Sequence, residues 1–392
     1  MMKRFVLTVL LLASPMLLAQ ELTQYTAVRV QKANELAQQE QLKEAIAVLK
    51  DIETSRDYDK AFVARMLAVF YWQDGNTKQA ISKMEYAVES GLLRDEQAWV
   101  SQRMLADLYL NDQKFAKALK HYYPLVKSVP ETQKAQDLWL RIAQSHYQLS
   151  QWEKVVSAAD QYMKVEKKRL LQSLSLKLGA QLELKRWSAA IPTLEQMITI
   201  QPDKLSWWRQ LVGLQMRIGK DKEALDTLAL AKLNDLPLSQ SDRRMLAQMY
   251  AKRGIPEKAA IEISELDEAD TDVQLLSEQA TYWQLAKEWD KSLSIWKLAA
   301  KKDAKYHWSV AQLMVQQGYY KDSLSVLDKV KGRDADVALA KTRALYKLNQ
   351  LDKALVQAKR ANNIEPSSQA KSWIKYLSQL REVSQQQQQT TG

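Results

Sequence analysis

The sequence of 392 residues contains no cysteine and only three histidines. Without cysteine, the chain can form no disulfide, no thiolate zinc site, no cysteine nucleophile and no lipid-modified cysteine anchor. His121, His146 and His307 lie far apart and form no HExxH pair, so a histidine-rich metal site is not expected. Glycine (9) and proline (8) are also scarce, which favours helix and argues against a turn-rich β fold.

Catalytic and cofactor motifs are missing as well. The sequence has no GxSxG, no Walker-type loop and no Gly-rich dinucleotide turn. Three acidic residues, Asp267, Glu268 and Asp270, stand close together, but in an expected loop, where carboxylates are solvated surface. We therefore expect a protein that is not an enzyme and that uses no cofactor and no metal.

Long apolar runs are confined to the N-terminus, MMKRFVLTVLLLASPMLLAQE. Lys3 and Arg4 precede the apolar run, a proline interrupts it, and Ala19 is a small residue at a cleavage-like position. This layout predicts a secretory signal peptide at residues 1–19. The alternative is an uncleaved anchor, but the run is shorter than the ~20 residues that a spanning helix needs. We expect export, and the lack of cysteine fits a bacterial periplasm.

The charge balance is basic. The formal net charge is +11, and removal of Lys3 and Arg4 with the signal peptide lowers it to +9. Such a balance would raise nucleic acid as a partner of a cytoplasmic protein. In an exported protein it points instead to acidic protein segments, anionic glycans or a membrane surface.

A repeated pattern covers most of the chain. Two small or apolar positions recur twelve residues apart, flanked on both sides by apolar residues at helical spacing. The second members of these pairs recur every 31 to 38 residues. The pairs are Ala33/Ala45, Ala68/Ala80, Ala106/Ala118, Ala143/Val155, Gly179/Ala190 (one residue short), Val212/Ala224, Ala247/Ala259, Ala280/Ser292, Ala311/Ser323 and Thr342/Ala354.

Each copy predicts two antiparallel helices that approach closely at the small residues. The turn between them often holds Gly or Asn, which tolerate a positive φ where the first helix ends. The pattern resembles the tetratricopeptide repeat over residues 26–366. The third copy carries the resemblance best, with Leu105, Ala106, Tyr109, Phe115, Ala118, Tyr122 and Pro130, and the fourth adds Trp139, Ile142, Ala143 and Trp152.

This resemblance implies an all-α fold, a right-handed superhelical α-solenoid of about ten helix-turn-helix repeats at residues 20–366. Residues 367–384 have an apolar face and are expected to form a capping helix. The Gln-rich residues 385–392 are expected to be disordered. Because Pro124 and Pro192 fall inside second helices and the fifth junction is short, irregularity is expected at 120–130 and 179–192.

The stretch RIAQSHYQLSQWEKV looks at first like a site, because a histidine, two aromatic residues and a carboxylate stand close together. In the repeat register, however, Trp152 is the turn aromatic, and His146 occupies a position that is aromatic in other copies. Glu153 lies on the surface of a second helix. We interpret the stretch as one structural module and His146 as a packed residue.

In the family that the repeat resembles, first helices line a concave groove that binds peptides. The resemblance places four arginines at one equivalent groove position, where they could grip carboxylates through paired hydrogen bonds. Solvated helices also carry arginines without binding anything, and the pattern leaves both interpretations open. The candidate groove residues are Arg65, Trp72, Arg103, Tyr147, Arg209, Arg217, Arg244, Lys252, Trp308, Gln312, Arg343 and Lys347.

The expected function is a non-enzymatic periplasmic adaptor that binds envelope proteins through acidic or extended segments. As a whole, the chain is similar to exported tetratricopeptide proteins associated with TonB-type energy-transduction systems. One alternative is a peptidoglycan- or glycan-binding helper of a cell-wall enzyme, which many exposed tryptophans along the groove would favour. Another is an envelope assembly or secretion scaffold.

Overall fold

The computed structural model describes residues 22–390, with side chains described as far as Val383. The regular secondary structure of this range is entirely helical, with no strand, which confirms the all-α fold class. The signal peptide predicted at 1–19 and the last residues of the tail, 391–392, lie outside the described residues. None of the described helices combines the length and apolar character needed to span a membrane.

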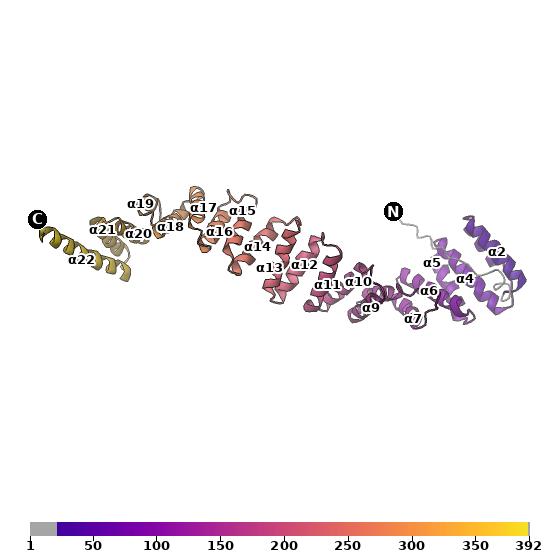
Figure 1. Cartoon of the computed structure of the whole chain (residues 1–392). Helices are drawn as coiled ribbons and strands as arrows, with labels where there is room; N and C mark the ends of the chain where they lie inside the picture. Colours follow the sequence, from indigo (N-terminus) through magenta and orange to yellow (C-terminus); the bar gives the residue numbers. More distant parts are fainter. Residues whose placement is uncertain (1–21, 391–392) are drawn as a thin grey trace. The chain divides into compact units, whose positions relative to one another are not determined.

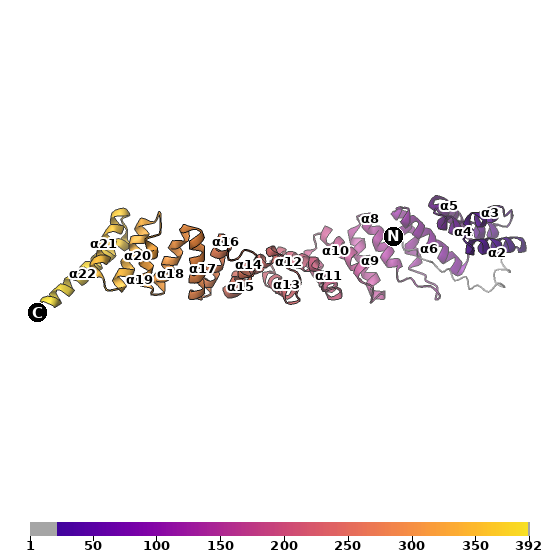
Figure 2. The ribbon, with the colours of Figure 1, turned by 90° about the horizontal axis from the view of Figure 1, so that it is seen from above.

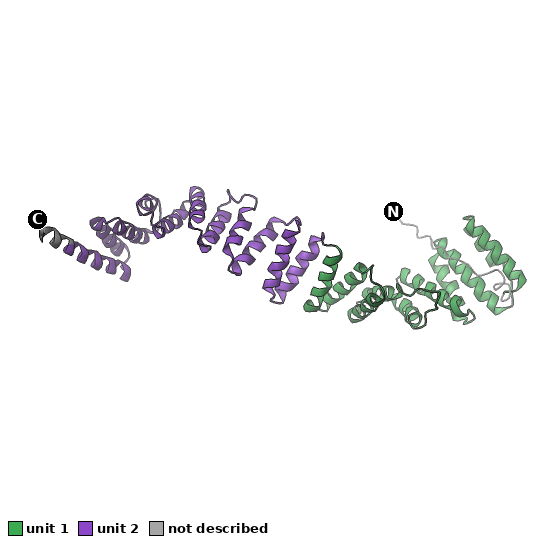
Figure 3. Ribbon diagram, viewed as in Figure 1, with its two compact units in different colours: residues 1–201 green, residues 202–392 purple. Residues whose placement is uncertain are grey.

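The chain divides into two compact units, residues 1–201 and 202–392 (Figure 3). In each unit, successive helices lie beside one another (Figures 1 and 2). The helices of the first unit are α2 (Gln24–Gln38), α3 (Leu42–Lys50), α4 (Asp57–Gln73), α5 (Thr77–Glu89), α6 (Asp95–Asn111), α7 (Phe115–Leu125), α8 (Leu138–Gln148), α9 (Trp152–Val165), α10 (Leu171–Glu183) and α11 (Trp187–Ile200).

The second unit continues the same alternation of first and second helices. Its helices are α12 (Leu205–Arg217), α13 (Asp221–Leu233), α14 (Gln240–Lys252), α15 (Pro256–Ser264), α16 (Val273–Leu285), α17 (Trp289–Lys302), the 3₁₀ turn η1 (Ala304–Tyr306), α18 (His307–Gln316), α19 (Tyr320–Leu327), α20 (Asp334–Lys347), α21 (Leu351–Ile364) and α22 (Ser368–Thr390).

A residue with positive φ closes the first helix of every pair from α2/α3 to α20/α21. The next backbone N–H then donates back to the last turn of the first helix, as from Lys220 to the Gln215 carbonyl at 2.8 Å. The spacing of these turns, 31 to 38 residues, matches the spacing of the small positions. The turn residues are Glu40, Gly75, Gln113, Ser150, Lys185, Gly219, Gly254, Lys287, Gly318 and Asn349.

The small positions are where the paired helices touch. All second members of the pairs, from Ala45 to Ala354, have no exposed surface. Most of these side chains are small, which allows two helix backbones to approach closely. The fifth pair corrects the sequence alignment, because Leu178, not Gly179, stands seven residues before the turn residue Lys185, as the first members of the other pairs stand before theirs. The spacing of twelve is therefore kept, and the fifth junction is not short.

The two internal prolines behave differently. Helix α7 ends at Leu125, one residue after Pro124, and an irregular segment follows until α8 begins. Helix α11 instead runs for 14 residues and includes Pro192. A proline removes one hydrogen bond from a helix, but its fixed φ is helical. The irregularity expected at 120–130 is therefore present from residue 126 onward, whereas 179–192 holds only the turn between α10 and α11, and α11 is continuous through Pro192.

Helix α22 covers the end of the second unit by packing against α21. Ala370 and Leu377 are fully buried, and Trp373 and Ile374 pack against the cluster that contains Leu377. The helix extends to Thr390, past the boundary expected at 384, into the segment expected to be disordered. Glutamine is a good helix former, and no helix-stopping glycine or proline stands before Thr390.

Candidate interaction surface

The predicted groove residues all lie on first helices. Arg65 is on α4, Arg103 on α6, Arg209 on α12 and Arg244 on α14. Each stands ten residues before the positive-φ residue of its own turn, so the four occupy one structural position. Trp308, on α18, has the same place in its pair. The equivalence inferred from the sequence therefore holds in the helices.

Three of these four arginines bind a carboxylate on the next first helix or at its start. Arg103 donates to Asp137 at 2.6 Å, Arg209 to Asp242 at 2.6 Å and Arg244 to Glu278 at 2.5 Å. Each pair lies within one unit and joins residues 33 or 34 positions apart. The arginines thus link neighbouring helix pairs, an internal role that the sequence did not predict.

The pair of Arg209 and Asp242 has the most complete geometry. The Nε of Arg209 donates to both carboxylate oxygens at 3.1 Å, and its Nη2 adds a third contact. Asp242 is only 8% exposed, and it also accepts hydrogen bonds from Ser239 in a capping box at the start of α14. Burial alone would raise the pKa of Asp242, but the hydrogen bonds from Arg209 and Ser239 outweigh it and lower that pKa.

Arg65 differs from the other three. It makes no ion pair with any described residue, and its guanidinium lies 5.9 Å from the centre of the Phe62 ring. Thirty-four residues further along, where an acidic residue would be needed, stands the buried Trp99. Burial lowers the pKa of Arg65. This half-buried cation is the member of the arginine set that lacks a carboxylate.

The aromatic candidates are mostly packing residues. Tyr147 meets Trp152 edge to face at 5.1 Å between ring centres, and its ring also lies against Gly179 on the next first helix. Trp308 is half-buried beneath the guanidinium of Arg333, at 5.6 Å. Trp72 alone among the candidate aromatics is exposed, at 39%.

The remaining polar candidates lie at the surface. Lys252 forms an ion pair with Asp221 at 2.5 Å, and Arg217 is exposed. Gln312, Arg343 and Lys347 are exposed on α18 and α20, and no described carboxylate pairs with Arg343 or Lys347. Contact of any of these residues with a partner stays a prediction.

His146 is a buried packing residue, as the repeat register predicts. It is 2% exposed, Tyr123 lies 2.7 Å from its Nε2, and Gln151 lies 2.7 Å from its Nδ1. Because the Gln151 atom is a carbonyl oxygen, Nδ1 carries the proton, and Nε2 accepts from the Tyr123 hydroxyl. Burial lowers the pKa of His146, although the hydrogen bond with Gln151 acts in the opposite direction.

Most tryptophans are packing residues as well. Eleven of the twelve are buried or half-buried, and Trp72 is the exception. Nor do the described side chains bring together three His, Asp or Glu groups in a way that could hold a metal ion. The positively charged residues, by contrast, are unevenly distributed along the chain.

Sequence reasoning missed where the positive charge resides. Residues 291–392 contain 18 Lys and Arg against 8 Asp and Glu, whereas residues 5–290 contain 37 against 38. A count of charge by segment would have found this. The basic segment begins in α17 and ends in α22, so it belongs entirely to the second unit.

Comparison with known proteins gives neighbours in structure alone. No family model and no curated protein matches the chain. A tetratricopeptide repeat protein from Parabacteroides merdae is 13% identical over 70% of this chain and 99% of its own, with a TM-score of 0.38. The C-terminal part of a TPR repeat-containing protein from Cytophaga hutchinsonii is 13% identical over 70% of this chain and 95% of its own, with a TM-score of 0.39.

A third neighbour is the TPR2AB domain of yeast Sti1, whose structure is of a complex with pHSP90. It is 16% identical over 65% of this chain and 98% of its own, with a TM-score of 0.31. All three are tetratricopeptide repeat proteins, the architecture that the sequence pattern predicts. At these identities the likeness concerns the fold alone.

Proposed function

We propose that the chain is a non-enzymatic scaffold that binds other proteins in the bacterial periplasm. The observation that carries this proposal is the contrast between packed tryptophans and open cations. Recognition of sugar rings typically uses exposed tryptophan faces, and here Trp72 is the one exposed tryptophan. Exposed cations that pair with no described carboxylate, such as Arg343 and Lys347, suit acidic protein segments instead. This contrast favours an adaptor over a glycan-binding helper.

The proposed location and partner class rest on the sequence. The signal-peptide layout supports export, and the repeat array without cysteine is similar to exported proteins that accompany TonB-type energy-transduction systems. These systems are therefore the first place to look for the partner. An envelope assembly or secretion machine would need the same kind of surface, so the test must identify the captured protein.

The test is crosslinking of the tagged, full-length chain in cells, followed by mass spectrometry. The variant of choice is Arg343→Glu with Lys347→Glu, because reversal of Arg209 or Arg244 would also break an internal ion pair. We expect capture of an envelope protein, and loss of that capture in the double variant. Recovery of wall glycan alone would replace the adaptor with a glycan-binding protein.

Export is tested separately in the same cells. We expect the protein in the periplasmic fraction, with an N-terminus that begins after residue 19. An intact N-terminus in the cytoplasmic fraction would refute the proposed location, whatever the crosslinking captures.

A further inference from the structure

Most cations of the basic segment lack an acidic partner. Of its 18 lysines and arginines, five form ion pairs with described residues. These five are Lys291, Lys305, Arg333, Lys341 and Arg381. Because unpaired like charges repel one another, this excess does not stabilise the fold, and the cations stay available to an acidic partner.

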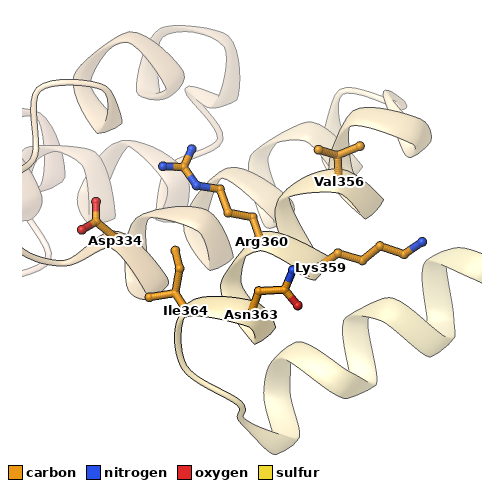
Figure 4. Close-up of a pocket in the computed structure, with 6 residues that line it drawn as sticks. All are labelled: Asp334, Val356, Lys359, Arg360, Asn363 and Ile364. Carbon is orange, nitrogen blue, oxygen red and sulfur yellow. The ribbon is translucent and has the colours of Figure 1, made fainter.

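Part of this charge surrounds an open hollow of ≈ 660 Å³ on α21. Lys359 and Arg360 stand on the rim, with Arg360 directed towards the side of Asp334 and Lys359 towards the opposite side (Figure 4). Val356 and Ile364 supply apolar lining and are 61% and 48% exposed. Neither Lys359 nor Arg360 forms an ion pair with a described residue.

The lining residues of α21 form one continuous face. They stand at positions 356, 359, 360, 363 and 364, which is the spacing of a single helix stripe. The helix therefore presents to solvent a stripe that is apolar at both ends and cationic between them. Asp334, at the start of α20, adds the one carboxylate of the hollow.

We propose that this stripe of α21 binds an acidic amphipathic segment of a partner protein. Carboxylates of the segment would pair with Lys359 and Arg360, and its apolar side chains would cover Val356 and Ile364. A nucleic acid backbone lacks the aliphatic side chains that would cover Val356 and Ile364, whereas an amphipathic protein segment supplies them beside its carboxylates. The inference rests on the proposed scaffold function and adds the chemistry of the partner and the place where it binds.

The test uses the mature full chain and a fluorescein-labelled peptide with Glu and Leu at helical spacing, measured by fluorescence anisotropy. Lys359→Glu with Arg360→Glu should weaken binding at least ~10-fold, because two attractive contacts become repulsive. Ile364→Ser should weaken it by about 5-fold while the salt dependence is kept. Circular dichroism checks that each variant is folded.

The matched control is Lys220→Glu with Lys222→Glu. It makes the same change in net charge at two exposed lysines outside the basic segment, and it should alter affinity less than ~2-fold. An equal loss in both double variants would show attraction by net charge alone and overturn the site. Equal or tighter binding of duplex DNA, polyglutamate or phosphatidylglycerol vesicles would overturn the partner class.

Absence of peptide binding at protein concentrations up to about 100 µM also rejects the inference. The two proposals fail separately. Capture of an envelope protein in cells that survives Lys359→Glu with Arg360→Glu would leave the scaffold function in place and refute only the α21 site. A chain that binds the peptide but captures no protein in cells would refute the scaffold function.

Discussion

At Asp242, burial and hydrogen bonding act on one carboxylate in opposite directions. The three contacts from Arg209 and the capping interactions with Ser239 favour the charged form more than burial disfavours it. The pKa of Asp242 is therefore lower in the folded chain than its ordinary value. A lowered pKa contributes stability that is present above the ordinary carboxyl pKa and is lost as the pH falls through the folded pKa.

We predict that Asp242→Asn lowers the free energy of unfolding by about 2 kcal/mol at pH 7, because it leaves Arg209 and the cap without their acceptor. The difference from the parent should shrink below about pH 4, where the unfolded chain takes up a proton at this carboxyl, and should be lost once the pH has fallen through the lowered pKa of the folded chain. Urea denaturation at both pH values measures this, with the exposed Asp267→Asn as control. A difference independent of pH would contradict the role of the charge.

The buried ring of His146 should make the stability of the folded chain depend on pH in the neutral range. Its pKa is lowered by burial, so the folded chain holds the neutral ring while the unfolded chain takes up a proton below about pH 6.5. Stability should therefore fall as the pH drops from 7 towards 5, and replacement by Gln should remove part of that fall. An NMR titration of the ring should give a midpoint below 6.5, and a midpoint above 6.5 would exclude the buried neutral state.

At the scale of the elements, the turns show what a sequence can and cannot specify. Gly219 and Asn349 indicate their turns in the sequence, because glycine and asparagine tolerate a positive φ. Lys185 and Lys287 do not, although they adopt the same conformation. The small residues at the helix contacts revealed those turns instead. The exception was the fifth pair, where the small Gly179 was aligned with the first position although the turn at Lys185 gives that position to Leu178.

The turns also allow a matched pair of substitutions. Lys287 is exposed and has a φ of 61°, so Lys287→Gly should relieve strain and raise stability by up to about 1 kcal/mol. Gly254→Ala at the equivalent turn should lower stability by about 1 kcal/mol, because a Cβ there meets no neighbouring atom and only the backbone is affected. Urea midpoints measure both, and changes of the same sign would contradict the explanation.

The arginine register was predictable, but its partners were not. Arg103, Arg209 and Arg244 share one position, whereas their carboxylates occupy different positions of the following helices. Which side chain reaches an arginine depends on the stagger and rotation of neighbouring helices, and these are properties of packing. The repeat therefore identified the fold from sequence, while the same pattern could not tell an internal contact from a binding contact.

At the scale of the whole molecule, the fold is an array in which helices contact mainly their neighbours along the chain. Stability in such an array is close to a sum of local terms and nearest-neighbour contacts. A change in one helix pair should therefore act over a short distance. Leu276 provides the test, because it is fully buried in α16 and packs in one cluster with α17 and α18.

We predict that Leu276→Ala destabilises this region by about 3 kcal/mol, the usual effect of a cavity in a packed core. Hydrogen exchange followed by mass spectrometry should then show faster exchange in α16 to α19 and unchanged exchange in α2 to α5. The same measurement on Leu105→Ala, an equally buried leucine on α6 of the first unit, should show faster exchange in α5 to α8 and unchanged exchange in α16 to α19. Uniform loss of protection in both variants would mean that the array unfolds as one cooperative body, because only long-range coupling could carry the effect across the unit boundary.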